Sequence, residues 1–227
     1  GLISFVLPAV VRICALAHNG CLTRVDPTTL SYSAFDSITG VAWISGNTGT
    51  MDEDNHYYFF IGAPPSFTPS YLYTINALTG EILSNPQVPA NYSSTSYVGG
   101  LEYDNNSDTL YGIFTNGSTN QMYFSWIDPV NGFVYPIDSL HSPSYGIGTT
   151  TYDSNHHRYF YNFAQMQYIL DSRTGHVIYS YQTPQYYIST KYNNSNDRLY
   201  CISNPITPLQ FEFDSIEIAT GTLHAIA

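Results

Sequence analysis

Two short motifs that recur along the chain constrain its fold more than any other feature of the sequence. In the first, an Asp or Asn is followed six and seven residues later by two large apolar or aromatic residues. In the second, a polar residue stands four positions before a glycine. The first motif occurs at Asp52 with Tyr58-Phe59, Asp104 with Leu110-Tyr111, Asp153 with Tyr159-Phe160 and Asn193 with Leu199-Tyr200, and the second at Asn76 with Gly80, Asp128 with Gly132, Asp171 with Gly175 and Glu217 with Gly221.

The spacing of these motifs shows that they belong to one repeat. The second motif begins 24 residues after the first in three copies and 18 residues after it in the copy at Asp153. The glycines advance along the chain by 52, 43 and 46 residues. Periods of roughly 40–50 residues are typical of propeller blades. A degraded fifth copy, Asp26-Pro-Thr-Thr-Leu30, has lost its glycine and predicts one more unit near the N-terminus.

Each unit is expected to form four short strands. Around the central copy these would cover 100–103, 109–114, 122–127 and 133–137, segments rich in β-branched and aromatic residues and separated by turn residues. No long window has a helical period. The sequence therefore predicts an all-β fold, a β-propeller of about five four-stranded blades that forms a single domain over residues 1–227. The later blades are expected at 40–88, 98–140, 146–183 and 187–227.

Residues 1–17 form the most apolar run of the chain. Pro8 and Arg12 interrupt it, and it is too short for a confident membrane span. A signal-peptide core is a rival interpretation, although the basic segment that would precede it is missing. We expect Ile3–Leu7 and Val11–Ala17 to be strands of a first blade. Alternatively, residues 1–10 form an arm that adds a strand to a neighbouring subunit.

The pattern resembles that of secreted β-propeller repeat proteins whose blades carry a YD…LY…D..TG signature. Here it is seen as Tyr103-Asp104, Leu110-Tyr111 and Asp128–Gly132, and again from Tyr152-Asp153 to Gly175. The resemblance covers residues 40–227 well and residues 1–39 poorly. It implies an architecture and not an activity, because propellers have many functions, and no functional residue is transferred from it.

The charge of the chain excludes some partners, and its sequons point to a compartment. The net charge is −11 and Lys191 is the single lysine, so the chain lacks the basic face that a nucleic-acid binder needs, and it is poorly suited to anionic lipid. Sequons of the Asn-x-Ser/Thr type fall in predicted turns, where an acceptor must be exposed. We therefore expect an extracellular or cell-surface glycoprotein. The four acceptors are Asn91, Asn105, Asn116 and Asn193.

Cysteines and possible metal ligands give weaker signals. Cys14 could pair with Cys21 across a hairpin or with Cys201 in an adjacent blade, and either choice leaves one thiol over. Asp104-x-Asn106-x-Asp108 resembles the opening of a calcium loop but lacks the glycine and the distant glutamate, so a structural turn is favoured. His156-His157-Arg158 is interpreted as a solvent-exposed turn. No metal or cofactor is expected.

Catalytic groups are scarce on the strands expected nearest the propeller axis. Over 40–45, 99–103, 146–152 and 187–192 the ionisable residues are Glu102 and Lys191. A glycoside hydrolase needs two carboxyl groups, so the sequence predicts a protein that is not an enzyme. Weak candidates for ligand contact at one mouth of the ring are Glu102, Tyr97, Tyr145, Tyr186 and Tyr187.

The predicted function is accordingly a surface function. We expect a structural or adhesive subunit that self-assembles through its apolar N-terminal arm and its tyrosine-rich faces. The alternative is a lectin-like propeller that binds carbohydrate, because the 22 tyrosines offer flat faces with polar edges. A relative of glycoside hydrolases is a third, weaker alternative.

Overall fold

The structure is a computed structural model. It describes residues 2–7, 10–16, 21–25, 29, 31–38, 41, 43–64, 66, 69–92, 98–140, 149–163, 165–183, 186–204 and 212–226. Side chains of most of the first 48 residues lie outside this description. The degraded motif at 26–30 also falls almost entirely outside it.

Five four-stranded antiparallel sheets follow one another along the chain, and in each the strands are paired in chain order. Within the described residues the single helix is the 3-10 turn Ala90–Tyr92, and no helix is long and apolar enough to cross a membrane. The strands of the five sheets are β1 (Leu2–Leu7), β2 (Val10–Leu16), β3 (Cys21–Val25) and β4 (Tyr32–Ser37); β5 (Trp43–Asp52), β6 (Tyr57–Ala63), β7 (Tyr71–Asn76) and β8 (Ile82–Ser84); β9 (Val98–Asp104), β10 (Thr109–Asn116), β11 (Gln121–Ile127) and β12 (Val134–Leu140); β13 (Thr150–Asp153), β14 (Arg158–Phe163), β15 (Met166–Asp171) and β16 (Val177–Gln182); β17 (Tyr186–Asn193), β18 (Arg198–Asn204), β19 (Glu212–Glu217) and β20 (Leu223–Ala225).

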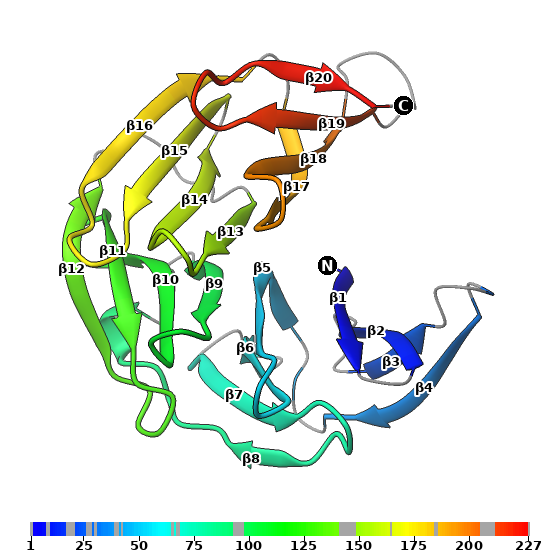
Figure 1. Cartoon of the computed structure of the whole chain (residues 1–227). Helices are drawn as coiled ribbons and strands as arrows, with labels where there is room; N and C mark the ends of the chain where they lie inside the picture. The colour runs from blue at the N-terminus through cyan, green and yellow to red at the C-terminus, as the bar shows by residue number, and fades with distance from the viewer. Residues whose placement is uncertain are drawn as a thin grey trace.

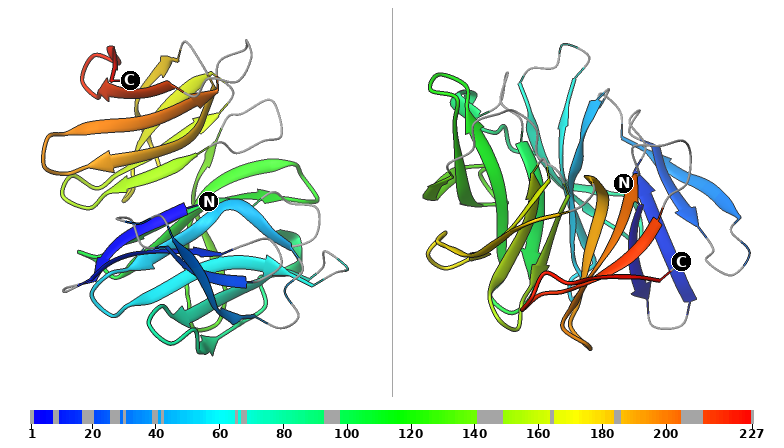
Figure 2. Two further views of the ribbon diagram at one scale, coloured as in Figure 1. Left: turned by 90° about the vertical axis from the view of Figure 1, so that its right-hand side faces the viewer. Right: turned by 90° about the horizontal axis from the view of Figure 1, so that it is seen from above.

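The sheets are arranged as the blades of a β-propeller. Figure 1 shows them fanning around a common axis, with the first strand of each blade innermost and the fourth on the rim. The inner strands β5, β9, β13 and β17 contact one another in that order. In Figures 1 and 2 the arc is open between the last blade and the first. The predicted all-β propeller of about five four-stranded blades is confirmed.

The N-terminal segment forms a strand within its own blade. Strand β1 pairs antiparallel with β2, from Leu2 opposite Ala15 to Leu7 opposite Val10. One edge of this apolar strand is thus paired with β2 of the same chain. The alternative, in which residues 1–10 add a strand to a neighbouring subunit, stays a prediction.

The first motif is a side-chain-capped turn between the first two strands of a blade. Asp153 illustrates it, because its Oδ1 accepts the backbone N–H groups of Asn155 and His156 at 3.1 and 3.3 Å. The residue four positions after the Asp or Asn adopts a positive φ in every copy, which closes the tight turn at a cost of local strain. These residues are His56, Asp108, His157 and Asp197.

The second motif is the turn between the third and fourth strands. Its glycine has a φ between 68° and 83° in all four copies, and the first residue of the motif accepts the glycine N–H through its backbone carbonyl. Glycine adopts such a φ without strain, which explains why the motif ends in this residue. Both motifs therefore encode turn geometry, as turn chemistry predicts.

Aromatic side chains fill the spaces between blades. Tyr103 stacks on Phe59 of the preceding blade with ring centroids 5.2 Å apart, and Tyr192 stacks on Phe160 at 5.4 Å. Tyr159 and Phe160 in β14 are fully buried. Burial of this kind contributes about 1.5–3 kcal/mol for each large side chain, so the contacts between blades hold the arc together.

Asp104→Ala should lower the stability of the protein more than the replacement of any exposed acidic residue. Its carboxylate is fully buried and accepts hydrogen bonds from Asn106 N–H, Ser107 Oγ and Tyr152 OH at 3.0, 2.6 and 3.0 Å. Three donors lose their acceptor, and the Tyr152 hydroxyl among them is buried, so we expect a loss of about 2–4 kcal/mol in the free energy of unfolding, measured by urea denaturation. Asp54→Ala, on an exposed turn residue, is the control and should change stability by less than about 0.5 kcal/mol. Equal effects would contradict the turn-cap interpretation.

Gly100→Ala tests the approach of β9 to β13. Gly100 has a φ of +63°, and an added Cβ would lie 2.2 Å from Thr150 Cγ2 and 2.5 Å from Tyr159 OH. Backbone strain and overpacking together should cost about 2–4 kcal/mol. Gly117→Ala, at an exposed turn, provides the matched control. A thermal denaturation midpoint that is the same in both variants would show that β9 does not lie against β13 in this way.

Candidate functional site

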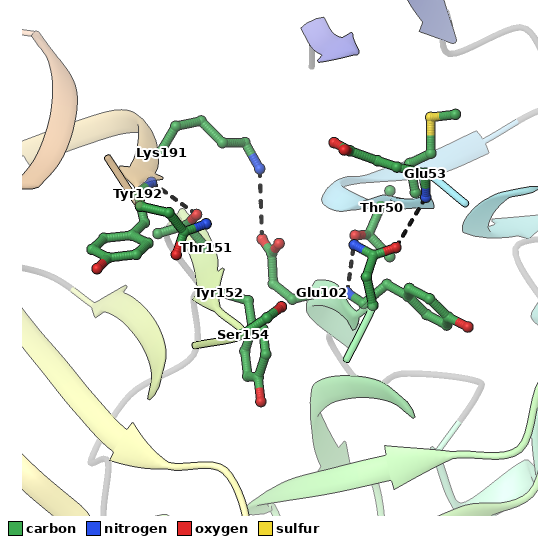
Figure 3. A pocket seen from close by; sticks show the side chains of 13 residues that line it. Thr50, Glu53, Glu102, Thr151, Tyr152, Ser154, Lys191 and Tyr192 are labelled. Carbon is green, nitrogen blue, oxygen red and sulfur yellow. Dashed lines mark hydrogen bonds and ion pairs between the residues drawn. The ribbon is translucent and has the colours of Figure 1, made fainter. Parts of the chain in front are cut away.

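A pocket opens where the inner strands of four blades end on one face of the propeller. Its volume is about 450 Å3, and its walls come from β5, β9, β13 and β17 and the turns that follow them. Glu102 and Lys191 both line it. Figure 3 shows the Lys191 side chain extending across the pocket toward Glu102. The carboxylate and the amine that the sequence places on the predicted inner strands are thus brought together.

The alternation of each inner strand explains why these two side chains lie in the pocket. Tyr103 and Tyr192 turn their rings between the blades, as described above. Successive side chains of a strand point to opposite faces, so the preceding residue in each strand, Glu102 or Lys191, points the other way. The Tyr103 N–H donates to Thr50 Oγ1 at 3.0 Å, and the equivalent Tyr192 N–H donates to Thr151 Oγ1 at 3.0 Å. These bonds fix both strands relative to the neighbouring blade.

Glu102 is held by the hydroxyl group of Thr150 rather than by a close ion pair. Its Oε1 accepts a hydrogen bond from Thr150 Oγ1 at 2.8 Å, whereas Lys191 Nζ lies 3.8 Å away. Tyr159 OH, beside Thr150, donates to the Gly100 carbonyl. The Glu102 side chain is 9% exposed and that of Lys191 is 57% exposed, so the carboxylate is buried and the amine is largely in solvent.

The protonation of Glu102 is shifted by its surroundings. Burial raises the pKa of its carboxyl group above the ordinary value, and the charge of Lys191 and the hydrogen bond from Thr150 oppose this rise without cancelling it. Burial disfavours the charged form of an acid. Glu102 is therefore a buried acid whose charge is only partly compensated.

The tyrosine rings in the pocket wall are each packed against another aromatic ring. Those of Tyr103 and Tyr192 are stacked between blades, and Tyr152 stacks on Tyr111 with centroids 5.5 Å apart. The hydroxyl of Tyr152 donates to Asp104 Oδ2, and burial raises its pKa. Apart from Glu102 and Lys191, the remaining lining consists of Thr, Ser and Asn residues together with Gly49, Met51 and Glu53. The pocket can therefore form hydrogen bonds but offers little surface for ring stacking.

A second carboxylate lies in the pocket wall. Glu53 follows β5 in the first-motif turn, a position outside the inner strands. Its backbone N–H donates to Asn105 Oδ1 at 3.0 Å, while its side chain is exposed and has no partner among the described residues. Glu53 is thus near the site but is not held in one position.

The predicted glycan acceptors lie on turns on two faces of the propeller. Asn105 and Asn193 belong to first-motif turns, and Asn105 itself lines the pocket. Asn91, in the 3-10 turn, is exposed, and its carbonyl accepts the N–H of Gly117 beside Asn116. The placement of all four suits attachment, and their occupancy stays a prediction.

The other predicted contact residues do not form this site. Tyr187 is 5% exposed and packs with Cys201 and Leu199 between the last two blades, so its ring is not available to a ligand, contrary to expectation. The pairing of β17 with β18 shifts register between Tyr187 and Ser189, so the strand is irregular at this point. Tyr97, Tyr145 and the side chain of Tyr186 lie outside the described residues.

The possible pairing of Cys14 with Cys201, one of two alternatives, is not formed. Cys201 is a buried free thiol, and burial together with the nearby Asp214 raises its pKa, which makes it unreactive. Cys14 stands opposite Arg24, so Cys21 is not its cross-strand neighbour either. The side chains of Cys14 and Cys21 are outside the described residues.

The acidic turns are occupied by protein groups. Asp153, His156 and Asp197 have ligand atoms close enough to share a metal ion, but Arg158 already lies between the two carboxylates, 2.6 Å from Asp153 and 2.5 Å from Asp197. A guanidinium in that place excludes a second cation. The carboxylate of Asp104 is likewise taken up by the turn and by Tyr152, as expected for a structural turn.

Sequence reasoning missed the residues that support the pocket. Thr150 holds Glu102, Tyr159 packs behind it, and Arg158 ties the fourth blade to the fifth, since it also donates to Tyr192 OH at 3.0 Å. The run Thr149-Thr150-Thr151 at the start of an inner strand was the available signal. Arg158 was interpreted as exposed with its neighbours, whereas it is half-buried.

Comparisons with known proteins identify the fold alone. No family model and no curated protein matches the chain. Similar solved structures include a nidogen/laminin complex (11% identity, TM-score 0.52, covering 93% of this chain and 91% of that one) and TolB from Acinetobacter baumannii (12%, 0.60, 91% and 48%). The Dos1 propeller is similar as well (14%, 0.56, 93% and 55%). This chain spans about half the length of the TolB and Dos1 chains.

Glu102→Gln should change how stability depends on pH. The folded pKa of Glu102 is raised, so its contribution is fully present below the unfolded value near 4.5 and is lost as the pH rises through the folded pKa. Gln stays neutral. The wild type should therefore lose stability relative to Glu102→Gln between pH 4 and pH 7, measured by urea denaturation at each pH. Glu81→Gln, on an exposed acid, should run parallel to the wild type. A Glu102→Gln curve parallel to the wild type would show that Glu102 is not buried as a charge.

Proposed function

We propose that this protein is a non-enzymatic extracellular propeller that binds carbohydrate, a small uncharged polyhydroxyl ligand, in the pocket around Glu102 and Lys191. The observation that carries the proposal is the pairing of one buried, hydrogen-bonded carboxylate with one solvent-exposed amine across a cavity. Glu102 acts as the acceptor and Lys191 as the donor.

Hydroxyl groups match this pair chemically. A carboxylate only accepts hydrogen bonds and an ammonium group only donates them, whereas a hydroxyl does both. Two neighbouring hydroxyls of a sugar can therefore bond to Glu102 and Lys191 at once. The two charges sum to zero, so an uncharged ligand leaves the electrostatic balance of the site intact. A charged ligand would be attracted by one member of this pair and repelled by the other, so the pair as a whole favours neither a cation nor an anion.

The size and lining of the pocket set the expected affinity. A cavity of about 450 Å3 falls within the range of small-ligand sites. Without free aromatic faces, recognition rests on charge-assisted hydrogen bonds worth ~1.5–3 kcal/mol each. Two such bonds correspond to a dissociation constant on the order of 1 mM.

The extracellular location is supported by the sequons. Their acceptors lie on turns, where a glycosyl group can be attached, and the chain carries a single lysine. Because Asn105 lines the pocket, a glycan on it would lie near the ligand.

We propose that the protein does not catalyse hydrolysis, because only one of the two carboxylates in the pocket is held in position by a neighbouring group. Glycoside hydrolysis requires an acid and a base or nucleophile held at a fixed separation. Glu102 is held, but the Glu53 carboxylate is exposed and unpartnered within the described part of the chain. A catalytic group needs support from its surroundings to stay in position.

Self-association is a second candidate function. The sequence-based argument for it rested on the N-terminal arm, which pairs with β2 of its own blade. The observation that favours self-association is instead the rim strand β16, which exposes Val177, Ile178 and Tyr179.

Calorimetric titration of the protein with methyl glycosides of several hexoses, each up to ~50 mM, tests the first proposal. At least one should bind, and Glu102→Gln should weaken its binding about tenfold, because a charged acceptor becomes a neutral one. Lys191→Met, which keeps most of the apolar stem, should weaken it similarly.

Glu81→Gln is the control for the loss of one negative charge and should bind like the wild type. The sugar should be recovered unchanged. No binding by any glycoside, or unchanged binding by Glu102→Gln, would rule out this site, and release of methanol would show that the protein is an enzyme.

A further inference from the structure

The fourth strand of each blade is an exposed sheet edge, and most of these edges are protected. Unpaired edge strands invite pairing with another chain, and proteins block this with short strands, prolines or charges. Strands β8 and β20 have three residues each. Strand β12 contains Pro136 and Asp138, and β4 contains Asp36.

Strand β16 lacks these protections. It has six residues, Val-Ile-Tyr-Ser-Tyr-Gln, with no charge and no proline. Within the described residues it pairs only with β15, and Figure 1 shows it on the outer rim. Its one irregularity is a register shift near Ile178, so Tyr179–Gln182 remain regular opposite Ile169–Met166.

The side chains of β16 are unusually exposed for an apolar strand. Val177 is 50% exposed, Ile178 43% and Tyr179 56%. No sequon falls between residues 149 and 183, so a glycan on any of the four acceptors would start from another blade or from the loop before the third blade. The rim of the fourth blade is thus both apolar and free of its own glycan.

Charge selects a second copy of the chain as the partner. The chain carries −11, so two copies repel over most of their surfaces. Next to β16, Arg173 is paired with Asp171 at 2.8 Å and His176 lies 3.2 Å from Asp138, so each of these two carboxylates beside the rim has a basic partner. A neutral strand meeting its own copy brings no like charges together.

We infer that two copies of this protein associate through β16, which pairs antiparallel with its symmetry mate about a two-fold axis. Such a contact is isologous, because the same patch is used on both copies. Close to the two-fold axis, Tyr179 and Ser180 of one copy would lie beside the same two residues of the other copy. This names the partner and the surface for the self-association candidate, and it does not depend on the pocket.

Sedimentation velocity of the full chain tests the inference. An edge of six residues gives a small interface and hence a weak one, so concentrations from ~10 µM to ~1 mM are needed. The wild-type mass should rise toward twice that of the chain, 25.4 kDa without glycans. Tyr179→Lys, which adds an edge-protecting charge at an exposed position, should keep the protein monomeric.

Leu83→Lys is the matched control, because Leu83 is 44% exposed on the outer strand of another blade. It should dimerise like the wild type. Ser180→Cys should also form a disulfide-linked dimer under mild oxidation, whereas Ser84→Cys should not. A wild type that is monomeric at ~1 mM, or equal loss of dimer in both lysine variants, would overturn the inference. If Tyr179→Lys stays monomeric and still binds the glycoside, carbohydrate binding in the pocket does not depend on association through β16.

Discussion

The inner strands of neighbouring blades belong to different sheets, and the hydrogen bonds that link them determine the rest of the structure. No shared backbone ladder joins these strands, so their edge N–H groups need other acceptors. Threonine hydroxyls supply them, since Thr50 accepts from Tyr103 N–H and Thr151 from Tyr192 N–H. Once those two amides are fixed, the rings of both tyrosines lie between blades and the preceding side chains point into the pocket. The packing between blades and the candidate site therefore have one origin.

The sequence predicts the blades well because their turns have local causes. An Asp that caps its own turn, followed four residues later by a positive φ, is specified within a few residues, as at Asp153 and His157. The strand boundaries follow from the spacing of such turns. The approach of Glu102 to Lys191 is a different matter, because it depends on the angle between two blades separated by a third. Sequence spacing could place both residues on inner strands, but it could not predict that Lys191 Nζ lies 3.8 Å from Glu102 Oε1.

The sequence-based errors arise where a long-range contact changes the role of a residue. Tyr187 was assigned to the mouth of the ring because it opens an inner strand, yet a register shift and the apolar cluster around Leu199 bury it. Arg158 was treated as part of an exposed turn, but its partner Asp197 comes from the next blade. No local pattern announces either contact. The exposed edge of β16 is a further case. Its sequence has no charge or proline, but this becomes significant only once the structure shows that β16 is an edge strand.

The strongest physical reason to regard Glu102 as functional is that its local environment suits a charge poorly. The buried carboxylates of Asp104 and Asp153 cap turns and are satisfied by several donors each. Glu102 caps nothing, has one hydroxyl donor and an amine beyond hydrogen-bond distance, and its pKa is raised. A neutral side chain would be more stable there at pH 7. Natural proteins break such rules mainly at functional sites, where stability is lost in return for binding. A ligand hydroxyl would supply the donor that Glu102 lacks.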